Sequence, residues 1–334
     1  MNMLRMQTRD VMDKVLERQW HVVGLGRDLD PGKVRGATIL GQDVVFWRCG
    51  DQLVAWDDIC AHRGVRLSLG SVIGDRLKCA YHGWEYSGEG RCVKIPAHPD
   101  ARIPERARVK QTFRAVEHIG MIWVNLSDDP APLPVLPEHS EPGFVPYPSG
   151  GYPLSAAAPR VVENFLDISH VPFVHDGYLA VRERPEIGDY TVHETEEGIF
   201  AENIVYYQPD PDGRGSAGDY LYDFGVLAPL TVYFRKYMHE PGARYVMVYN
   251  VRPVSETESV AYMGTVMNYA TDTAYEQVAD FQSLIVSQDK PMTESQRPEL
   301  LPLDLAEELH LKSDKLAIAY RRYLRKLGLS FGTQ

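Results

Sequence analysis

The chain has 334 residues, of which 44% are hydrophobic, and its formal net charge is −11 at pH 7. This length and apolar content allow two domains, or one large domain, with an ample core. The acidic balance argues against a nucleic acid or an anionic membrane as a partner, because both bind to basic surfaces.

The first 36 residues predict an amphipathic helix at about 7–18, followed by a strand at 20–25. The helix lacks the apolar core of a signal peptide, and no stretch of the sequence approaches the length of a membrane-spanning helix. The four cysteines are too few for a disulfide framework, which fits a reducing compartment. We therefore expect a cytoplasmic protein.

Residues 37–128 predict a small all-β domain, because short apolar segments alternate with Gly- and Asp-containing turns. The expected strands lie at 37–40, 44–48, 53–56, 111–119 and 121–124. A proline-rich linker closes this domain. The expected division of the chain is a leading helix and strand at 1–36, the β domain at 37–128 and a larger domain at 129–334.

Two cysteines and two histidines are concentrated in the β domain. Cys60 and His62 form one pair, Cys79 and His82 form the other, and sixteen residues separate the pairs. Two thiolates with two imidazoles suit a soft or borderline metal. Two kinds of centre fit this set: a tetrahedral zinc ion, or a [2Fe–2S] cluster with two cysteines on one iron and two histidines on the other.

The larger domain predicts antiparallel strands and helices, so the expected fold class is α+β. Residues 135–151 are rich in proline and glycine, and we expect them to be irregular and to lie on the surface. The expected helices lie at about 159–170, 271–296 and 311–327. Alternating apolar and polar residues predict strands at 189–194, 198–207, 220–226, 231–238, 244–251 and 259–268.

A second group of potential ligands lies on the first helix of this domain. Asn164, Asp167 and His170 are spaced three residues apart and share one helix face. His175 is about 140° out of line with that face, but Pro172 would end the helix near His170 and let the chain return. Two histidines brought together in this way supply two of the three ligands of a two-histidine, one-carboxylate iron site.

The third ligand of such a site is a carboxylate, and Asp289 is the candidate. Phe281, Ile285 and Asp289 lie on nearly one stripe of the expected 271–296 helix. A carboxylate on an otherwise apolar stripe is unfavourable to bury unless it is paired or bound to a metal.

Two alternatives to Asp289 as a ligand stay open. Asp289 would be unremarkable at a solvated helix end before Pro291, with Lys290 as its ion-pair partner. Other carboxylates of the same helix would then take its place; these are Glu294 and Asp280.

The residues around these ligands carry a family resemblance. The segments Cys60-Ala-His-Arg-Gly64 and Cys79-Ala-Tyr-His-Gly-Trp84 resemble the two ligand loops of Rieske iron–sulfur proteins. Ala80 stands where that family usually has proline, which removes no ligand. The pattern Asn-x-x-Asp-x-x-His-x4-His, from Asn164 to His175, is similar to the mononuclear iron motif of Rieske non-haem iron oxygenases, and residues 287–296 resemble the segment with the third ligand. The motifs stand in that family's order, and the resemblance covers nearly the whole chain.

The resemblance implies a terminal oxygenase α subunit, in which a small Rieske domain precedes a catalytic domain with a curved antiparallel sheet flanked by helices. The implied ligands of the [2Fe–2S] cluster are Cys60, His62, Cys79 and His82. The implied ligands of a mononuclear Fe(II) are His170, His175 and Asp289.

The resemblance also implies partners. In this family the cluster of one subunit works with the iron of its neighbour in a head-to-tail homotrimer. Asp167 would be the bridge, hydrogen-bonded to His170 and to His82 of the partner subunit. Electrons would come from NAD(P)H through a separate reductase or ferredoxin, because the sequence has no flavin or nicotinamide motif.

The C-terminal residues indicate the kind of reaction. Residues 295–298 and 313–328 resemble two groups of Rieske enzymes, the saxitoxin-biosynthesis hydroxylases and the purine-alkaloid N-demethylases. We expect O2-dependent monohydroxylation of a polar heterocyclic or aromatic small molecule. The alternative is N- or O-demethylation, in which a methyl carbon is hydroxylated and lost as formaldehyde.

Two other protein classes would account for part of these motifs. A Rieske electron carrier with a binding domain explains the first ligand group and leaves the second without a role. A zinc-stabilised scaffold protein is the other class.

Within the larger domain, the loop at 208–219 is a candidate cover for the pocket. Four strand residues would either face the substrate or pack in the core: Met247, Tyr249, Met263 and Thr265.

Overall fold

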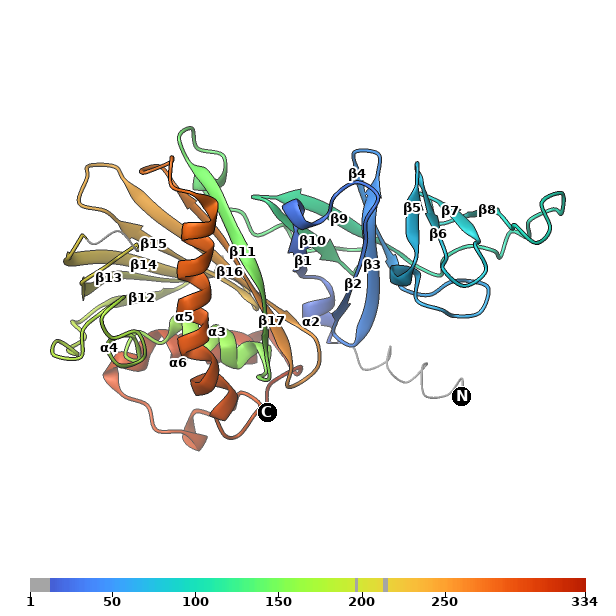
Figure 1. Ribbon diagram of the computed structural model, residues 1–334. Coiled ribbons are helices and arrows are strands. Elements are labelled where there is room, and N and C mark those ends of the chain that lie inside the picture. The colour runs from blue at the N-terminus through green and yellow to red at the C-terminus, as the bar shows by residue number, and fades with distance from the viewer. Residues whose placement is uncertain (1–12, 196–197, 213–215) are drawn as a thin grey trace. The chain divides into compact units, whose positions relative to one another are not determined.

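The computed structural model describes residues 13–195, 198–212 and 216–334 (Figure 1). The chain forms two compact units. The first is Glu17–Ala131, and the second is Pro132–Gln334 together with the residues just before Glu17.

The N-terminal helix is only partly within the described residues. Of the helix expected at 7–18, residues 7–12 lie outside them, and α2 (Lys14–Glu17) is helical. Among the residues that the structure describes, no helix is both long and apolar enough to cross a membrane.

The first unit is built on a six-stranded antiparallel sheet. In order across the sheet, its strands are β1 (Trp20–Leu25), β10 (Met121–Asn125), β9 (Thr112–His118), β4 (Gln52–Asp57), β3 (Gln42–Cys49) and β2 (Val34–Ile39). The expected strand at 20–25, which we placed before the β domain, pairs with β10 and is therefore part of this unit. Its partner is about a hundred residues away along the chain, a distance that local sequence patterns do not reveal.

A second, four-stranded sheet carries the Cys and His loops. Its strands, in order, are β5 (Ser71–Ile73), β6 (Arg76–Lys78), β7 (Glu85–Ser87) and β8 (Cys92–Lys94). Each strand has three residues, which is too short for an alternating pattern to identify. The sequence pattern therefore does not reveal this sheet.

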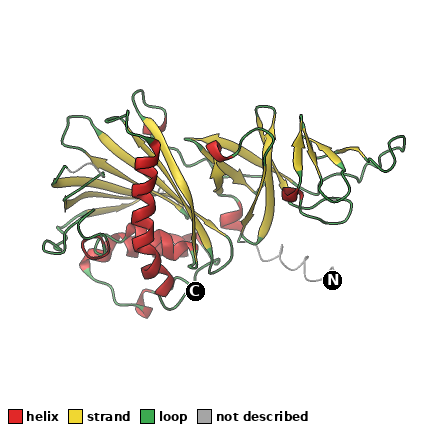
Figure 2. Ribbon diagram, in the orientation of Figure 1, coloured by secondary structure: helices red, strands yellow, loops and turns green. Residues whose placement is uncertain are grey.

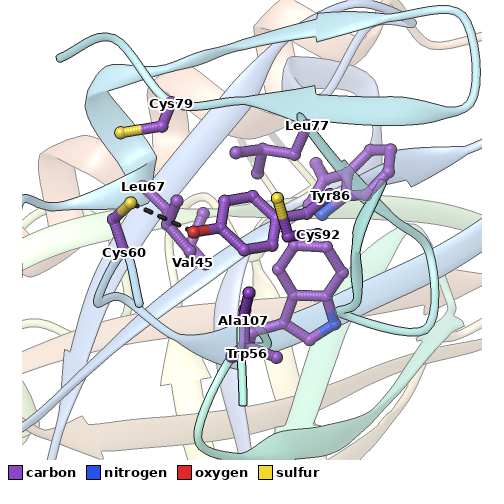
Figure 3. Packing of buried hydrophobic residues seen from close by; sticks show 11 residues of the cluster. Val45, Trp56, Cys60, Leu67, Leu77, Cys79, Tyr86, Cys92 and Ala107 are labelled. Atoms are coloured by element: carbon purple, nitrogen blue, oxygen red, sulfur yellow. Dashed lines mark hydrogen bonds between the residues drawn. The ribbon is translucent and has the colours of Figure 1, made fainter. Parts of the chain in front are cut away.

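One cluster of buried apolar residues packs against the two loops and includes Cys60 and Cys79 (Figure 3). Trp47 and Trp56 meet edge to face, with ring centroids 5.5 Å apart. Leu67, Leu77 and Tyr86 pack in the same cluster and are fully buried. Because protein interiors are close-packed, this cluster supports the backbones of the loops that carry Cys60 and Cys79.

The second unit contains a seven-stranded sheet in which every neighbouring pair is antiparallel. In order, the strands are β11 (Val145–Leu154), β17 (Ser259–Met267), β16 (Arg244–Pro253), β15 (Thr231–Tyr237), β14 (Gly218–Ala228), β13 (Ile199–Gln208) and β12 (Thr191–Glu194). Six of these strands match the expected ones to within a few residues, and the α+β fold class is confirmed.

The expectation that residues 135–151 are irregular is wrong for β11. This strand pairs with β17 at the edge of the sheet, where prolines such as Pro146 and Pro148 do not interrupt a ladder on both sides. The register shifts between Gly150 and Tyr152. A Cβ on Gly150 would lie 2.4 Å from the ring of Tyr262, so this irregular point requires glycine.

Helices pack against one another and against this sheet (Figure 2). They are α3 (Ala158–Leu166), α4 (Val171–Val174), α5 (Tyr275–Ser295) and α6 (Lys315–Leu327). Short 3-10 segments are η1 (Gly26–Asp28), η2 (Leu67–Leu69), η3 (Pro137–His139), η4 (Leu305–Glu307) and η5 (Lys312–Asp314). Helix α5 contacts the edge strand β11, and α3 contacts both β16 and α5. These contacts place α3 and α5 side by side over the sheet.

Candidate metal centres and substrate cavity

The loops that begin at Cys60 and Cys79 have the same hydrogen-bond pattern. Each cysteine N–H donates to the carbonyl five residues on, at 2.8 Å for Cys60 and 2.9 Å for Cys79. The glycine four residues on, Gly64 or Gly83, donates back to the cysteine carbonyl at 2.9 or 3.1 Å. Both glycines have a positive φ, 72° and 68°, which residues with a Cβ rarely adopt. The two loops are therefore matching closed turns, each carrying one Cys–His pair.

The imidazoles of His62 and His82 come together although they lie on different loops. Their Nδ1 atoms are 3.1 Å apart, and their ring centroids are 4.5 Å apart. The indole of Trp84 stacks on His62 with the ring planes 6° from parallel. Burial, followed by the charges of His82 and Arg63, lowers the pKa of His62. A neutral imidazole is the form that binds a metal.

The two thiols lie deeper than the imidazoles. Cys60 and Cys79 are 3% and 1% exposed, and neither forms a disulfide. Figure 3 shows the hydroxyl of Tyr86 beside Cys60, with Oη and Sγ 3.1 Å apart. Burial raises the pKa of the Cys79 thiol, so the thiolate is unfavourable here unless a cation binds it. Two buried thiols and two converging Nδ1 atoms fit the donor set of a Rieske [2Fe–2S] cluster.

The second ligand group is built on a broken helix, as expected, but the break is in a different place. Helix α3 ends at Leu166, and Asp167 already has an extended ψ of 111°. A turn leads to His170, which precedes the single-turn helix α4, and His175 follows that turn. Pro172 therefore does not end the first helix. It lies in the first turn of α4, where its missing N–H removes no hydrogen bond.

The short helix α4 explains how two histidines five residues apart meet. The N–H groups of Phe173 and Val174 both donate to the carbonyl of His170, and His175 N–H donates to Val171. The resulting tight turn brings the imidazoles of His170 and His175 to a centroid distance of 5.2 Å. Asn164, Asp167 and His170 do not share one continuous helix face, contrary to the expectation.

Asp289, from the middle of α5, completes the group. Its Oδ1 lies 3.3 Å from Nε2 of His170 and 3.1 Å from Nε2 of His175. Potential ligand atoms of the three residues all lie within 4.8 Å of one another. Asn164 of α3 also approaches Asp289, with Nδ2 3.4 Å from Oδ1. The geometry brings together the two histidines and one carboxylate of a facial metal triad.

The outer nitrogen of each histidine faces an oxygen, but only that of His175 lies within hydrogen-bond distance of it, and Nδ1 of His170 has no hydrogen-bond partner among the described residues. Nδ1 of His175 is 2.8 Å from Oε1 of Gln288, and Nδ1 of His170 is 3.8 Å from Oδ2 of Asp167. With Nδ1 of His175 as the donor to Gln288, Nε2 of that ring can offer its lone pair to a metal. Burial opposes the charge of Asp289, but its contacts with His170 and His175 outweigh burial and lower the pKa of Asp289 to about 2. A buried, ionised carboxylate between two imidazoles fits a divalent cation.

The two carboxylate oxygens of Asp167 contact different residues. Oδ1 accepts hydrogen bonds from the N–H and hydroxyl of Ser169, at 2.8 and 2.7 Å. Oδ2 faces His170, and the side chain as a whole is 38% exposed. Asp167 is thus fixed on one side and accessible on the other.

The other carboxylates considered as the third ligand do not join the two histidines in this group. Lys290 binds Glu294 at 2.6 Å and the carbonyl of Pro153 at 2.5 Å, so it does not pair with Asp289. Glu294 also accepts from the N–H of Ser155 at 2.7 Å, and Asp280 is exposed. Helix α5 continues through Pro291 to Ser295, so Asp289 is not at a helix end.

A cavity opens from the triad into the second unit. Its empty volume is about 800 Å³, counted together with the part that is open to solvent. Met247, Tyr249 and Met263 line it, whereas Thr265 is buried with its hydroxyl 3.5 Å from that of Tyr245. Of the expected covering loop at 208–219, Gln208 and Pro211 line the cavity, and residues 213–215 lie outside the described part.

Sequence reasoning missed several polar residues of this cavity and of the triad's surroundings. They are Gln208, Lys236, Gln282 and Gln288. For Lys236 a signal was available: it shares a face of β15 with Phe234, and a lysine on an apolar face is unusual. The glutamines carry no comparable signal, because glutamine is common on exposed helix and strand faces.

Comparison with known proteins identifies the family. The C-terminal domain of vanillate O-demethylase oxygenases matches residues 154–330, more than half of the chain, and the Rieske [2Fe–2S] domain matches residues 19–112. The chain belongs to the Rieske non-haem iron oxygenases. The first match includes His170, His175 and Asp289, and the second includes both Cys–His loops.

Similar members of the family are demethylases. Methylxanthine N1-demethylase NdmA of Pseudomonas putida is 32% identical over 295 residues, which cover 86% of this chain and 81% of that protein. Methylxanthine N3-demethylase NdmB of the same organism is 29% identical over 319 residues, covering 88% and 83%. The structure of NdmA with caffeine matches with a TM-score of 0.80 at 29% identity, covering 93% of this chain and 91% of NdmA. Dicamba monooxygenase, at 23% identity, shares the fold with a TM-score of 0.76, covering 93% and 97%.

Membership confirms the main expectations of the sequence analysis. The chain is the terminal oxygenase of a Rieske system, with a [2Fe–2S] cluster and a mononuclear iron as cofactors and O2 as the oxidant. It acts on a small molecule with electrons from a reductase. The zinc scaffold and the simple electron carrier are excluded, because neither has the catalytic domain that matches residues 154–330.

Proposed function

We propose that this oxygenase removes a methyl group from a planar aromatic heterocycle by hydroxylating the methyl carbon. The observation that carries the proposal is the aromatic wall of the cavity next to the triad. Phe165 stacks on Tyr249 at 4.9 Å and on Phe234 at 5.7 Å, with ring planes 11° and 18° from parallel. Flat apolar walls favour flat ring substrates. The N-methyl substrates named for NdmA and NdmB support a methyl group as the target.

The residues of the chain would form two metal sites with different roles. Cys60, His62, Cys79 and His82 would hold the cluster, and His170, His175 and Asp289 would hold the iron. The chemistry that these groups supply when bound is activation of O2 and insertion of one oxygen atom into a C–H bond. Gln288 holds the imidazole of His175 in the orientation that frees Nε2. The aromatic wall excludes water from the methyl group and keeps the ring plane fixed.

The overall reaction balances with two electrons from NAD(P)H through the reductase. An N–CH3 group, O2, two electrons and two protons give N–CH2OH and water. The N–CH2OH group then releases formaldehyde and leaves N–H. The same first step without the second is a hydroxylation, so the fate of the product separates the two reactions.

Asp167 supports a head-to-tail homotrimer as the working assembly. Its Oδ1 is engaged by Ser169, while its side chain is 38% exposed beside His170. An exposed carboxylate so close to a ligand of the iron can accept a hydrogen bond from His82 of the partner subunit, which is itself exposed on its loop. We infer that this bridge joins the two metal centres across the subunit interface.

The cysteines support a reducing compartment such as the cytoplasm. Cys49, Cys60, Cys79 and Cys92 are all free thiols. Two of them are the expected cluster ligands, and an oxidising compartment would favour disulfides instead.

The test is turnover of the reconstituted holoenzyme with a generic reductase, NADH and 18O2 on a panel of N-methylated heterocycles and their unmethylated counterparts. We expect products that have lost one CH2 unit, with an equal amount of formaldehyde. Products that gain one labelled oxygen and release no formaldehyde would make the enzyme a ring hydroxylase. Failure of every methylated compound to react, with NADH consumption no higher than without substrate, would contradict the proposal.

A further inference from the structure

The cavity has a second polar end, made by Lys236, Gln208, Gln282 and two tyrosines. Lys236 is only 2% exposed, and Gln208 and Gln282 are 1% and 3% exposed. All three line the cavity, together with Tyr222 and Tyr245. Neither the metal triad nor the aromatic wall includes any of these residues, so the proposed chemistry leaves this polar end without a role.

The ammonium group of Lys236 lies among neutral partners. It donates to the carbonyl of Pro211 and lies 3.5 Å from Oε1 of Gln208. It also lies over two rings, 4.9 Å from the centroid of Tyr245 and 5.7 Å from that of Tyr222. In the part of the chain that the structure describes, no carboxylate forms an ion pair with it, although Asp210 and Asp212 lie close enough to favour its charge.

A buried lysine without an ion pair is unfavourable in the free protein. Burial lowers the pKa of Lys236 to about 7, against the opposing charges of Asp212 and Asp210. An ammonium has three N–H donors, and the protein engages two of them. The third donor can bind a ligand in the cavity. Strongly perturbed, buried charges of this kind are frequent at ligand-binding sites.

The remaining polar groups are mostly occupied by one another. Tyr222 donates to Oε1 of Gln208 at 2.8 Å, and the amide of Gln208 donates to the carbonyl of Leu179 at 2.7 Å. Gln282 donates to the hydroxyl of Tyr245. These bonds hold the surroundings of Lys236 rigid and leave its ammonium as the one positive charge at this end, among the described residues that line the cavity.

Two independent measures give the separation of this end from the triad. Gln282 and Asp289 lie seven residues apart on nearly the same face of α5, which corresponds to about 10 Å along the helix. On the sheet, Lys236 pairs with Tyr245, and Tyr249 lies close enough to Asp289 for that charge to add to burial in raising the pKa of Tyr249. The four residues from Tyr245 to Tyr249 span about 13 Å. The aromatic wall lies between the two ends.

We propose that Lys236 determines substrate specificity by binding an anionic oxygen, such as a carboxylate or phenolate, at the end of the substrate opposite to the oxidised methyl group. This inference rests on the proposed function, because it takes the triad as the place of oxidation. The substrate class is then a planar, methylated heteroaromatic acid whose charged oxygen lies on the order of 10 Å from the triad. An anion would supply the ion pair that Lys236 lacks, whereas a neutral carbonyl would only add to the neutral acceptors already present.

The test compares acids with neutral compounds of the same shape. The probes are 4-methoxybenzoate against 4-methoxybenzamide, and 1-methylindole-5-carboxylate against its carboxamide. Their dissociation constants for the unreduced holoenzyme are measured by equilibrium dialysis at about pH 6, where Lys236 is charged and benzoic acids are ionised. We expect each acid to bind at least tenfold more tightly than its amide. Lys236→Met should reduce that preference to nearly one, and Lys236→Arg should keep part of it.

A matched control separates the local effect from the change in net charge. Lys326→Met removes one positive charge from an exposed position on α6 and should leave the preference unchanged. Equal binding of acid and amide to the wild-type enzyme, no binding of either, or a preference that survives Lys236→Met would overturn the assignment. Failure of a tightly bound acid to lose its methyl group would instead contradict the proposed function.

Discussion

The two metal centres of this molecule are built in opposite ways. The proposed Rieske ligands come from two matching turns that lie close in the sequence, and each turn is closed by its own backbone hydrogen bonds. The proposed mononuclear ligands come from a broken helix and from α5, more than a hundred residues later. Their positions depend on how α3 and α5 pack together. The first centre is therefore a local structure, and the second is a product of the tertiary fold.

This difference explains what each centre can do. Rigid local turns suit a cluster that changes only its charge when it transfers an electron. A site shared between packed helices can open onto a cavity, because its ligands occupy one side and leave the other to the substrate. Substitutions at each centre can test this contrast.

The largest effect is expected for Asp289→Ala. Removing the one proposed ligand from α5 should release the mononuclear iron and lower turnover by more than about a hundredfold, since loss of residues that only orient ligands already costs 10–100-fold. The Rieske absorbance and the signal of the reduced cluster in electron paramagnetic resonance should not change. Asp280→Ala, an exposed carboxylate on the same helix, is the control. Simultaneous loss of both centres would show that they are not independent structures.

Asp167→Ala tests the connection between the centres. Both metals should stay bound, because Asp167 is not among the proposed ligands, but turnover should fall by about a hundredfold. The measurement is single-turnover oxidation of the reduced cluster in the presence of substrate and O2. Ser169→Ala, which removes one donor to Asp167, should have a much smaller effect. Normal cluster oxidation in Asp167→Ala would refute the bridge.

A smaller effect is expected for Gln288→Leu. This change removes the acceptor that lies 2.8 Å from Nδ1 of His175, so the ring loses its fixed orientation. We expect the iron affinity to fall by about tenfold, measured by competition with a chelator, while the cluster stays intact. Gln277→Leu, an exposed position on α5, is the control. An unchanged iron affinity would mean that the packing of α4 alone orients His175.

The smallest effect concerns stability. The pKa of Lys236 is lowered in the folded state from 10.5 to about 7, so at pH below 7 the folded protein carries the full penalty of a buried charge. Between pH 7 and 10.5 the unfolded chain binds the extra proton, and stability rises with pH. Lys236→Met should therefore raise the melting temperature by a few degrees near pH 6, and the gain should shrink toward pH 9. A gain that grows with pH would contradict the assigned shift.

The same contrast explains what the sequence could predict. Cys60, His62, Cys79 and His82 were predicted from a short motif, because a local turn is specified by local residues such as Gly64 and Gly83. His170, His175 and Asp289 were also predicted, but the break in the helix was placed near His170 instead of after Leu166. The reason is that proline fits the first turn of a helix as well as it ends one.

Features that depend on distant partners were missed. Strand β11 contains prolines that predict an irregular segment, and only its position at the sheet edge makes the strand acceptable. The three-residue strands of the four-stranded sheet have no readable period. Lys236 and Gln282 meet around one cavity from a strand and a helix, and no spacing in the sequence connects them.

The most direct test of this account is the ratio of iron to acid-labile sulfide in the purified protein. A [2Fe–2S] cluster together with one mononuclear iron gives about three irons to two sulfides per chain. The account predicts this ratio for the wild-type protein and about two to two for Asp289→Ala. A wild-type ratio of two to two that Asp289→Ala does not change, with the chain fully loaded with cluster, would contradict the assignment of His170, His175 and Asp289 as an iron site.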